Sequence, residues 1–387
     1  MKRRSVLTVA LGLLLAAGAS PALAQEKLRI ALDTNPVHVR NKGVEVFVAE
    51  LKKRTGNRFA IEVYPSGQLF RDRDVPRALR QDALEMGVPG TWQLDSAEPN
   101  AALQTLPMFY GLERDVVYKV MDGKAGDFLN RRFEERLKVK IPGKWMDLGH
   151  QHYYSINKPI NGYSDLKGIK IRYPGGTANA ARATAMGGVA LLVPWPDVPL
   201  AMSQGVMDAM MTTFESVRSS KLMDSGLKYA FRDKQYFGQY VPMIRESFWK
   251  KQPKDVQDAI IESWNIAVAW QRDAAGEAQK SSEDDLKKAG LKVVAPADGD
   301  IANMRKILMQ GQAELVEVDR PRDLGDARVR RGERDRVAVQ RPQDSDESHR
   351  AEAHHHHADD ALGLHQDRKS TRLNSSHTDI SRMPSSA

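Results

Sequence analysis

The sequence contains no cysteine among its 387 residues. A disulfide framework, a thiolate metal site and a cysteine nucleophile are therefore excluded. Common enzyme patterns are also missing: there is no G-x-S-x-G, no H-E-x-x-H, no P-loop and no G-x-G-x-x-G after a strand. Only His38, His150 and His152 precede the C-terminal region, and no carboxylate is placed to complete a metal site with them. We therefore expect no catalytic residue, no metal and no cofactor.

Dense positive charge is absent as well. The formal net charge is +8, yet Lys and Arg are spread along the chain after the first four residues. Nucleic-acid-binding proteins concentrate such charge on one surface, so no nucleic-acid partner is expected. A mildly basic surface suits the attraction of anionic solutes.

Residues 1–24 have the order of a secretory signal peptide. Lys2-Arg3-Arg4 supplies the charged start, Val6 to Ala19 is apolar, and Ala22-Leu23-Ala24 offers the small residues of a cleavage site. The apolar run is shorter than the roughly 20 residues that a membrane-spanning helix needs. We expect export and cleavage near Ala24, with the Sec and twin-arginine routes both open.

Strand and helix patterns alternate along the first half, which favours an α/β fold with parallel strands. The length indicates two domains. The predicted elements of the first unit are strand 27–32, a helix around 44–51, strand 59–64, helix 75–84 and strand 85–88. A stop at Thr55-Gly56-Asn57 ends the first helix.

A second unit of the same kind begins near Gly149. Its predicted elements are strand 168–174, helix 178–186, strand 189–193, a helix with Asp197 as its N-cap, and strand 207–213. One long helix, 256–278, with Ile260, Trp264 and Trp270 on or near its apolar side, is followed by strand 291–294 and a final helix, 301–316. We expect two α/β lobes with a ligand cleft between them. Lobe 1 is 25–148 joined by about 236–275, and lobe 2 is 149–235 joined by about 276–317.

The pattern changes near Val318. From there to Ala387 no apolar period of 2 or 3.6 is found, and His354 to His357 form a run of four. The final Arg368 to Ser376 segment resembles vector- or adapter-derived sequence. We expect residues 318–387 to be disordered or non-native, and they are left out of the functional reasoning.

A series of blocks in the middle of the chain points to one family. They read Gly168-Ile169-Lys170-Ile171-Arg172, then Val193-Pro194-Trp195-Pro196-Asp197, then Gln204-Gly205-Val206-Met207-Asp208. Supporting blocks come earlier, at 64–69, 106–110, 157–160 and 165–168. Together they resemble the solute-binding proteins of TRAP transporters, over residues 25 to about 316.

The resemblance implies a periplasmic clamshell with one long helix running behind both lobes. It also implies closure on a small organic carboxylate and delivery to a membrane permease of a small and a large subunit, driven by an ion gradient. We expect the protein to act as a monomer. Two other functions stay open at this point: a ligand-binding subunit of a membrane sensor, and an exported hydrolase.

Arg172 is the main candidate for binding. It ends a predicted strand, where α/β folds place their ligands, and a guanidinium holds a carboxylate through two parallel hydrogen bonds. The alternative is a surface arginine or one paired with a structural aspartate. In the family that this chain resembles, the arginine of this motif clamps the substrate carboxylate.

Further candidates follow from the same resemblance. Trp195 takes the place of an aromatic pocket residue, although it could be a core tryptophan. Thr212 and Thr213 stand where relatives often carry an asparagine, and a hydroxyl can still donate and accept. His152, beside Gln151, stands where many relatives have a second arginine, whose loss favours a monocarboxylate with an apolar or aromatic body. Trp92 is either a pocket wall or a surface loop residue.

Overall fold

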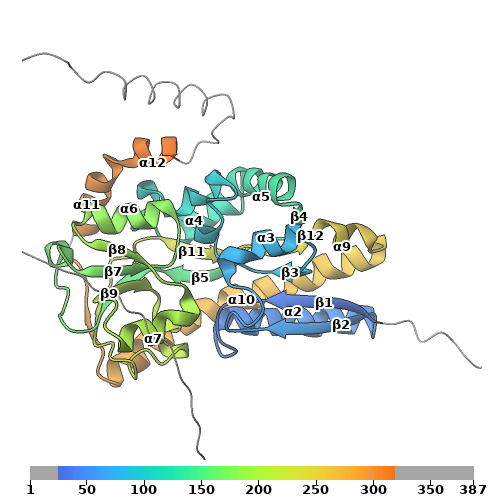
Figure 1. Ribbon diagram of the computed structural model, residues 1–387, viewed down its shortest axis with the longest axis horizontal. Coiled ribbons are helices and arrows are strands. Elements are labelled where there is room, and N and C mark those ends of the chain that lie inside the picture. The colour runs from blue at the N-terminus through green and yellow to red at the C-terminus, as the bar shows by residue number, and fades with distance from the viewer. Residues whose placement is uncertain (1–24, 298, 319–387) are drawn as a thin grey trace, which may run out of the picture. The chain divides into compact units, whose positions relative to one another are not determined.

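The computed structural model describes residues 25–297 and 299–318. The predicted signal peptide, 1–24, and all but the first residue of the predicted tail, 318–387, lie outside the described residues. No helix in the described ranges combines the length and apolar character needed to cross a membrane. The described residues form two sheets joined by a two-stranded ribbon (Figure 1).

The first sheet has the strand order β2-β1-β3-β12-β4. Its strands are β1 (Glu26–Ala31), β2 (Phe59–Tyr64), β3 (Met86–Gly87), β4 (Val139–Lys140) and β12 (Met243–Arg245). The helices of this lobe are α2 (Val39–Thr55), α3 (Val75–Arg80), α4 (Arg114–Met121), α5 (Lys124–Leu137) and α9 (Glu246–Lys251). Leu28 and Ile30 of β1 pack into one core cluster and Ala31 into another, as expected when side chains alternate along a strand.

The second sheet has the strand order β13-β10-β6-β9-β7-β8. Its strands are β6 (His152–Ser155), β7 (Lys170–Tyr173), β8 (Val189–Leu192), β9 (Ala209–Thr212), β10 (Tyr229–Phe231) and β13 (Lys292–Val294). The helices around it are α6 (Thr177–Ala185), α7 (Val198–Ser203), α8 (Phe214–Ser219), α11 (Asp300–Met309) and α12 (Gln312–Val318).

Both sheets are mixed, so the expectation of parallel strands holds for only part of each. In the second sheet β6 runs antiparallel to β9 and to β10, and in the first β12 runs antiparallel to β3 and to β4. Parallel neighbours need a crossover connection. β6 and β12 instead enter their sheets directly from the ribbon strands, without a crossover helix.

The ribbon and the longest helix connect the two lobes. β5 (Met146–His150) pairs antiparallel with β11 (Phe237–Tyr240), and in Figure 1 this ribbon lies between the two sheets. α10 (Lys254–Lys288) packs on α2 of the first lobe and α8 of the second, which confirms the predicted long helix. Trp270 is predicted on or near the apolar side of this helix, but it is 44% exposed. It lies six residues after Trp264 and is therefore rotated by about 240° around the helix axis. The lobe boundaries stay a prediction.

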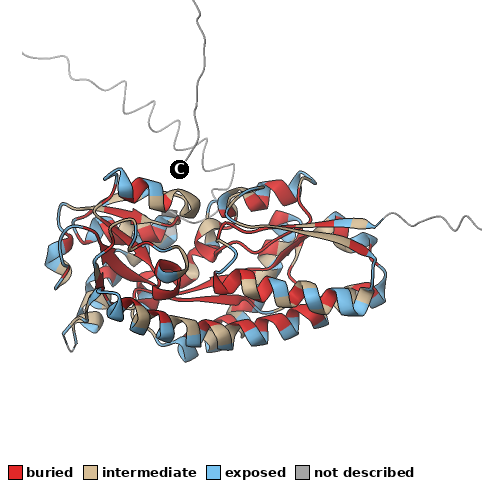
Figure 2. Cartoon of the chain, turned by 90° about the horizontal axis from the view of Figure 1, so that it is seen from below, coloured by how far each residue is buried: buried red, intermediate tan, exposed pale blue. Residues whose placement is uncertain are grey.

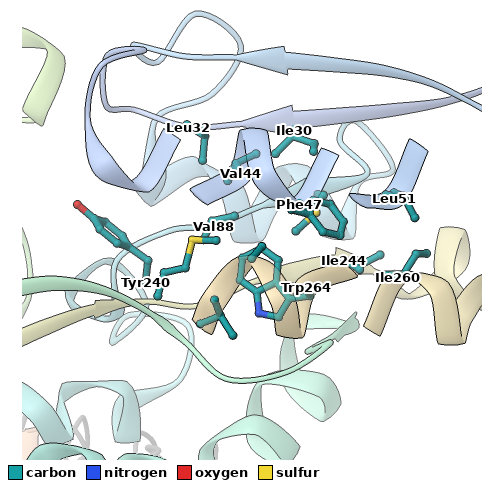
Figure 3. Packing of buried hydrophobic residues seen from close by; sticks show 14 of the residues in the cluster. Ile30, Leu32, Val44, Phe47, Leu51, Val88, Tyr240, Ile244, Ile260 and Trp264 are labelled. Carbon is teal, nitrogen blue, oxygen red and sulfur yellow. The ribbon is translucent and has the colours of Figure 1, made fainter. Parts of the chain in front are cut away.

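Helices α2 and α10 pack closely against each other. Phe47 and Trp264 meet edge to face with ring centroids 5.5 Å apart (Figure 3), and the Trp264 indole donates to the Lys144 carbonyl at 2.8 Å. A Cβ added to Gly43 would lie 2.6 Å from Cγ of Gln271. A glycine at position 43 therefore lets α2 and α10 come this close together. Figure 2 shows the buried residues gathered in the strands and the exposed ones on the outer helix faces.

Candidate functional site

A small cavity lies where residues from both lobes meet. It is lined by Asp33, Thr34, Asp72, Trp92, Gln93, Leu148, Gln151, Arg172, Pro174, Trp195, Thr212, Ser216 and Tyr240. Its volume of about 30 Å³ is room for about two water molecules. An organic ligand therefore enters only if the lobes part.

Arg172 is buried in the wall of this cavity, with only 2% of its surface exposed. Its Nε donates to the Val193 carbonyl at 2.9 Å and its Nη1 to the Met211 carbonyl at 3.0 Å. These bonds orient the guanidinium but leave its charge uncompensated, since no carboxylate among the described residues forms a salt bridge with it. Burial lowers its pKa to about 10, so the group is still a cation at neutral pH.

Arg40 is a useful comparison, because it is equally buried and fully paired. Its Nη2 bonds Asp33 Oδ1 at 2.5 Å and its Nη1 bonds Asp72 Oδ2 at 2.8 Å. These carboxylates raise its pKa above the ordinary value despite the burial. Its guanidinium also lies 4.3 Å from the ring centroid of Tyr240. Arg40 is thus neutralised by two carboxylates, whereas Arg172, like the buried Arg182, forms no salt bridge with a described carboxylate. Arg172 differs from Arg182 in that it lines the cavity.

Two other polar groups of the cavity wall also lack a partner. Nε2 of Gln151 and Oδ1 of Asp72 are buried and make no hydrogen bond to any described residue. Unpaired buried polar atoms are rare in native structures and call for an explanation. Residues that line the cavity therefore carry an unpaired donor and an unpaired acceptor in addition to the Arg172 guanidinium.

Aromatic side chains supply the apolar surface of the cavity. Trp195 lies beside Arg172, with the guanidinium carbon 5.4 Å from its ring centroid. Trp92 is 5% exposed, and its ring lies 5.6 Å from that of Tyr240. Trp92 therefore lies in the wall of the cavity and not in a surface loop.

The cavity thus brings together four of the six sequence-predicted residues, namely Arg172, Trp195, Thr212 and Trp92. Thr213 lies outside the lining and caps α8, where its Oγ1 accepts the Ser216 amide at 3.3 Å. His152 also lies outside it, and its Nδ1 accepts the Lys234 amide at 3.1 Å. Burial lowers its pKa well below the ordinary value, so this imidazole is neutral. Binding roles for all six stay predictions.

Contacts across the cleft hold the lobes together around the cavity. Arg71 forms two hydrogen bonds to Asp197, at 2.6 and 3.0 Å. Gln93 Nε2 donates to the Pro174 carbonyl at 2.7 Å. Asp197 is the N-cap residue of α7, as predicted, but its carboxylate binds Arg71 and makes no capping hydrogen bond.

Comparison with known proteins identifies the family of the chain. Residues 31–317 match the family of the bacterial extracellular solute-binding proteins, family 7. The chain is 26% identical over 301 residues to the 2,3-diketo-L-gulonate-binding periplasmic protein of Escherichia coli, covering 77% of this chain and 90% of that one. It is 24% identical over 272 residues to the C4-dicarboxylate-binding periplasmic protein of Rhodobacter capsulatus, covering 70% and 80%.

Solved structures share the fold. A TRAP periplasmic solute-binding protein of Sulfurospirillum deleyianum with bound succinate has a TM-score of 0.70 at 21% identity, covering 78% of this chain and all of that one. The sugar-acid-binding protein of Advenella mimigardefordensis in complex with galactonate has a TM-score of 0.71 at 17% identity, covering 76% and 96%. With the family match spanning most of its length, the chain belongs to the bacterial extracellular solute-binding proteins of family 7.

Proposed function

We propose that this protein is a periplasmic subunit that captures a small organic carboxylate for an ion-gradient-driven TRAP permease. The observation that carries the proposal is the buried, uncompensated guanidinium of Arg172 in the cavity wall. Leaving a charge buried without a partner is costly. A ligand carboxylate would compensate that charge and complete the paired state that Arg40 already has.

The other lining residues fit the same ligand. Nε2 of Gln151 is a free donor for the second carboxylate oxygen. Trp195 offers an apolar face beside the guanidinium, Thr212 offers a hydroxyl, and Trp92 closes the lobe 1 side. Relatives named for 2,3-diketo-L-gulonate and for C4-dicarboxylates support a small organic acid.

The hydrolase alternative is opposed by geometry. Ser216, His38 and Glu215 have the residue types of a hydrolytic triad, and Ser216 lines the cavity. However, Nδ1 of His38 accepts the Arg40 amide at 3.1 Å, so its proton is on Nε2. That same Nε2 faces both Glu215, at 2.9 Å, and Ser216, at 3.1 Å. A triad needs the carboxylate on the other nitrogen and a free Nε2 to take the serine proton.

The test is to identify what the protein carries. Small molecules released from protein purified under native conditions are identified by mass spectrometry, and the main species is titrated back by calorimetry. We expect an organic acid that binds one to one and is recovered unchanged. Uptake of that acid by cells with the permease should require this protein. A neutral ligand, or turnover of the bound molecule, would contradict the proposal.

A further inference from the structure

The cavity has opposite chemistry at its two sides. Arg172, on β7, comes from the second lobe, whereas Asp33 and Asp72 come from the first. Burial lowers the pKa of Arg172, and Tyr236 and the negative charge of Asp33 act in the opposite direction. The acidic group therefore lies within electrostatic reach of the cation across the cavity.

The acidic side has capacity left for a hydrogen-bond donor. Asp72 is 2% exposed, and its Oδ2 already accepts from Arg40 at 2.8 Å and from the Gly90 amide at 3.2 Å. Its Oδ1 accepts from none of the described residues. Asp33 accepts from Arg40 at Oδ1. An unpaired, desolvated carboxylate oxygen costs free energy that a ligand hydroxyl would recover.

Charge decides which donor fits this side. Two aspartates and the Arg40 that pairs with both carry a formal net charge of −1, so a second ligand carboxylate on this side would be repelled. An ammonium group would lie beside the Arg40 guanidinium, which already forms salt bridges with both aspartates. Burial raises the pKa of Asp72, so its carboxylate is already destabilised as an anion and a second negative charge beside it is further disfavoured. A hydroxyl donates a hydrogen bond without adding charge.

We propose that the site selects a hydroxylated monocarboxylate, with its carboxylate on Arg172 and a hydroxyl donating to Asp72. This inference rests on the proposed function and narrows it. Dicarboxylates of the same length are rejected by the acidic side. Unhydroxylated acids leave Oδ1 of Asp72 unpaired.

Calorimetry with matched acids tests the selection. The four-carbon set is erythronate, succinate, butanoate and 4-aminobutanoate, and the six-carbon set is galactonate, galactarate and hexanoate. In at least one set, the hydroxylated monocarboxylate should bind at least about tenfold more tightly than every other member, since a site built for a hydroxyl penalises its loss. Tighter binding of succinate, galactarate or 4-aminobutanoate would overturn the inference.

Two variants separate this inference from the proposed function. Asp72→Asn removes the charge, so galactarate should gain about tenfold relative to galactonate. Asp74→Asn, two residues away and half-exposed, should leave that ratio unchanged. If Asp72→Asn does not fold, calorimetry of the matched acids on the wild-type protein still tests the inference. Dicarboxylate preference that depends on Arg172, or failure of both hydroxylated monocarboxylates to bind, would overturn the inference alone, whereas a co-purified ligand without a carboxylate would overturn both.

Discussion

Buried ionisable side chains distinguish this protein at the scale of single residues. Asp233 is fully buried, accepts the Tyr110 hydroxyl at Oδ2 at 2.5 Å, and lies 4.0 Å from His152. Burial raises its pKa to about 7, against about 3.9 in an unfolded chain. The folded state therefore binds this proton more tightly than the unfolded state does.

The consequence is a pH-dependent stability with a defined sign. Because the folded pKa is raised, the free energy of unfolding falls as pH rises from about 4 to about 7. Asp233→Asn stays neutral and still accepts from Tyr110. Its stability relative to wild type should therefore improve over that range, by the order of a few kcal/mol. Denaturant unfolding at several pH values measures this, with exposed Asp115→Asn as a control expected to be flat. A difference that does not vary with pH would refute it.

Part of the cavity lining could be predicted from the sequence, because the ends of strands can be recognised there. Thr212 is the last residue of β9 and Arg172 is the last but one of β7, and ligands gather at strand ends. Asp33 and Thr34 follow β1 in the same way and could have been predicted on that ground. Asp72 begins a short 3-10 helix, Asp72–Asp74, and has no such signal. Gln151 lines the cavity and its neighbour His152 does not, because adjacent residues in extended chain point in opposite directions.

At the scale of elements, local periodicity predicted β2 and the start of α10 well. It missed α4 and α5, and it missed the ribbon of β5 and β11, whose pairing joins residues about ninety positions apart. The predicted helix 75–84 stops at Arg80, and Asp82 follows with a φ of 57°. The predicted final helix is divided between α11 and α12. Antiparallel β6 and β12 depend on tertiary pairing that no local pattern encodes.

The contact between α2 and α10 gives a prediction at this scale. Gly43→Ala would normally favour a helix, but here the new Cβ meets Gln271, whose amide bonds the Asp147 backbone at 2.8 Å in both directions. We expect a loss of about 1–3 kcal/mol in the free energy of unfolding. Gly162→Ala has open space and should be near neutral. Denaturant unfolding compares the two, and equal stabilities would argue against tight packing here.

At the scale of the whole molecule, the cavity is enclosed between the two lobes and is reached when they separate. The described lobes are linked by the chain around Gln151 and Tyr236 and by α10, which allows hinge motion. We expect the radius of gyration from X-ray scattering to decrease when the ligand saturates the protein. Identical curves with and without ligand would contradict a closing cleft.

The pair of Arg71 and Asp197 contributes little to this closure. Both side chains are more than a third exposed, and such pairs are worth about 0–1 kcal/mol. Arg71→Ala should therefore weaken ligand binding by no more than about fivefold. A larger loss in calorimetry would mean that the pair holds the closed state.

Arg172 carries the central claim, and one measurement tests it most directly. Removing one partner of a buried charge pair costs about 2–5 kcal/mol, so Arg172→Ala should weaken binding of the identified acid roughly thirtyfold or more. Arg172→Lys keeps the charge without the planar fork and should also be impaired. Arg71→Ala, a cleft cation that already has a partner, is the matched control. Calorimetry on the three variants, each checked by thermal melting, gives the answer. Wild-type affinity in a folded Arg172→Ala protein would contradict the account.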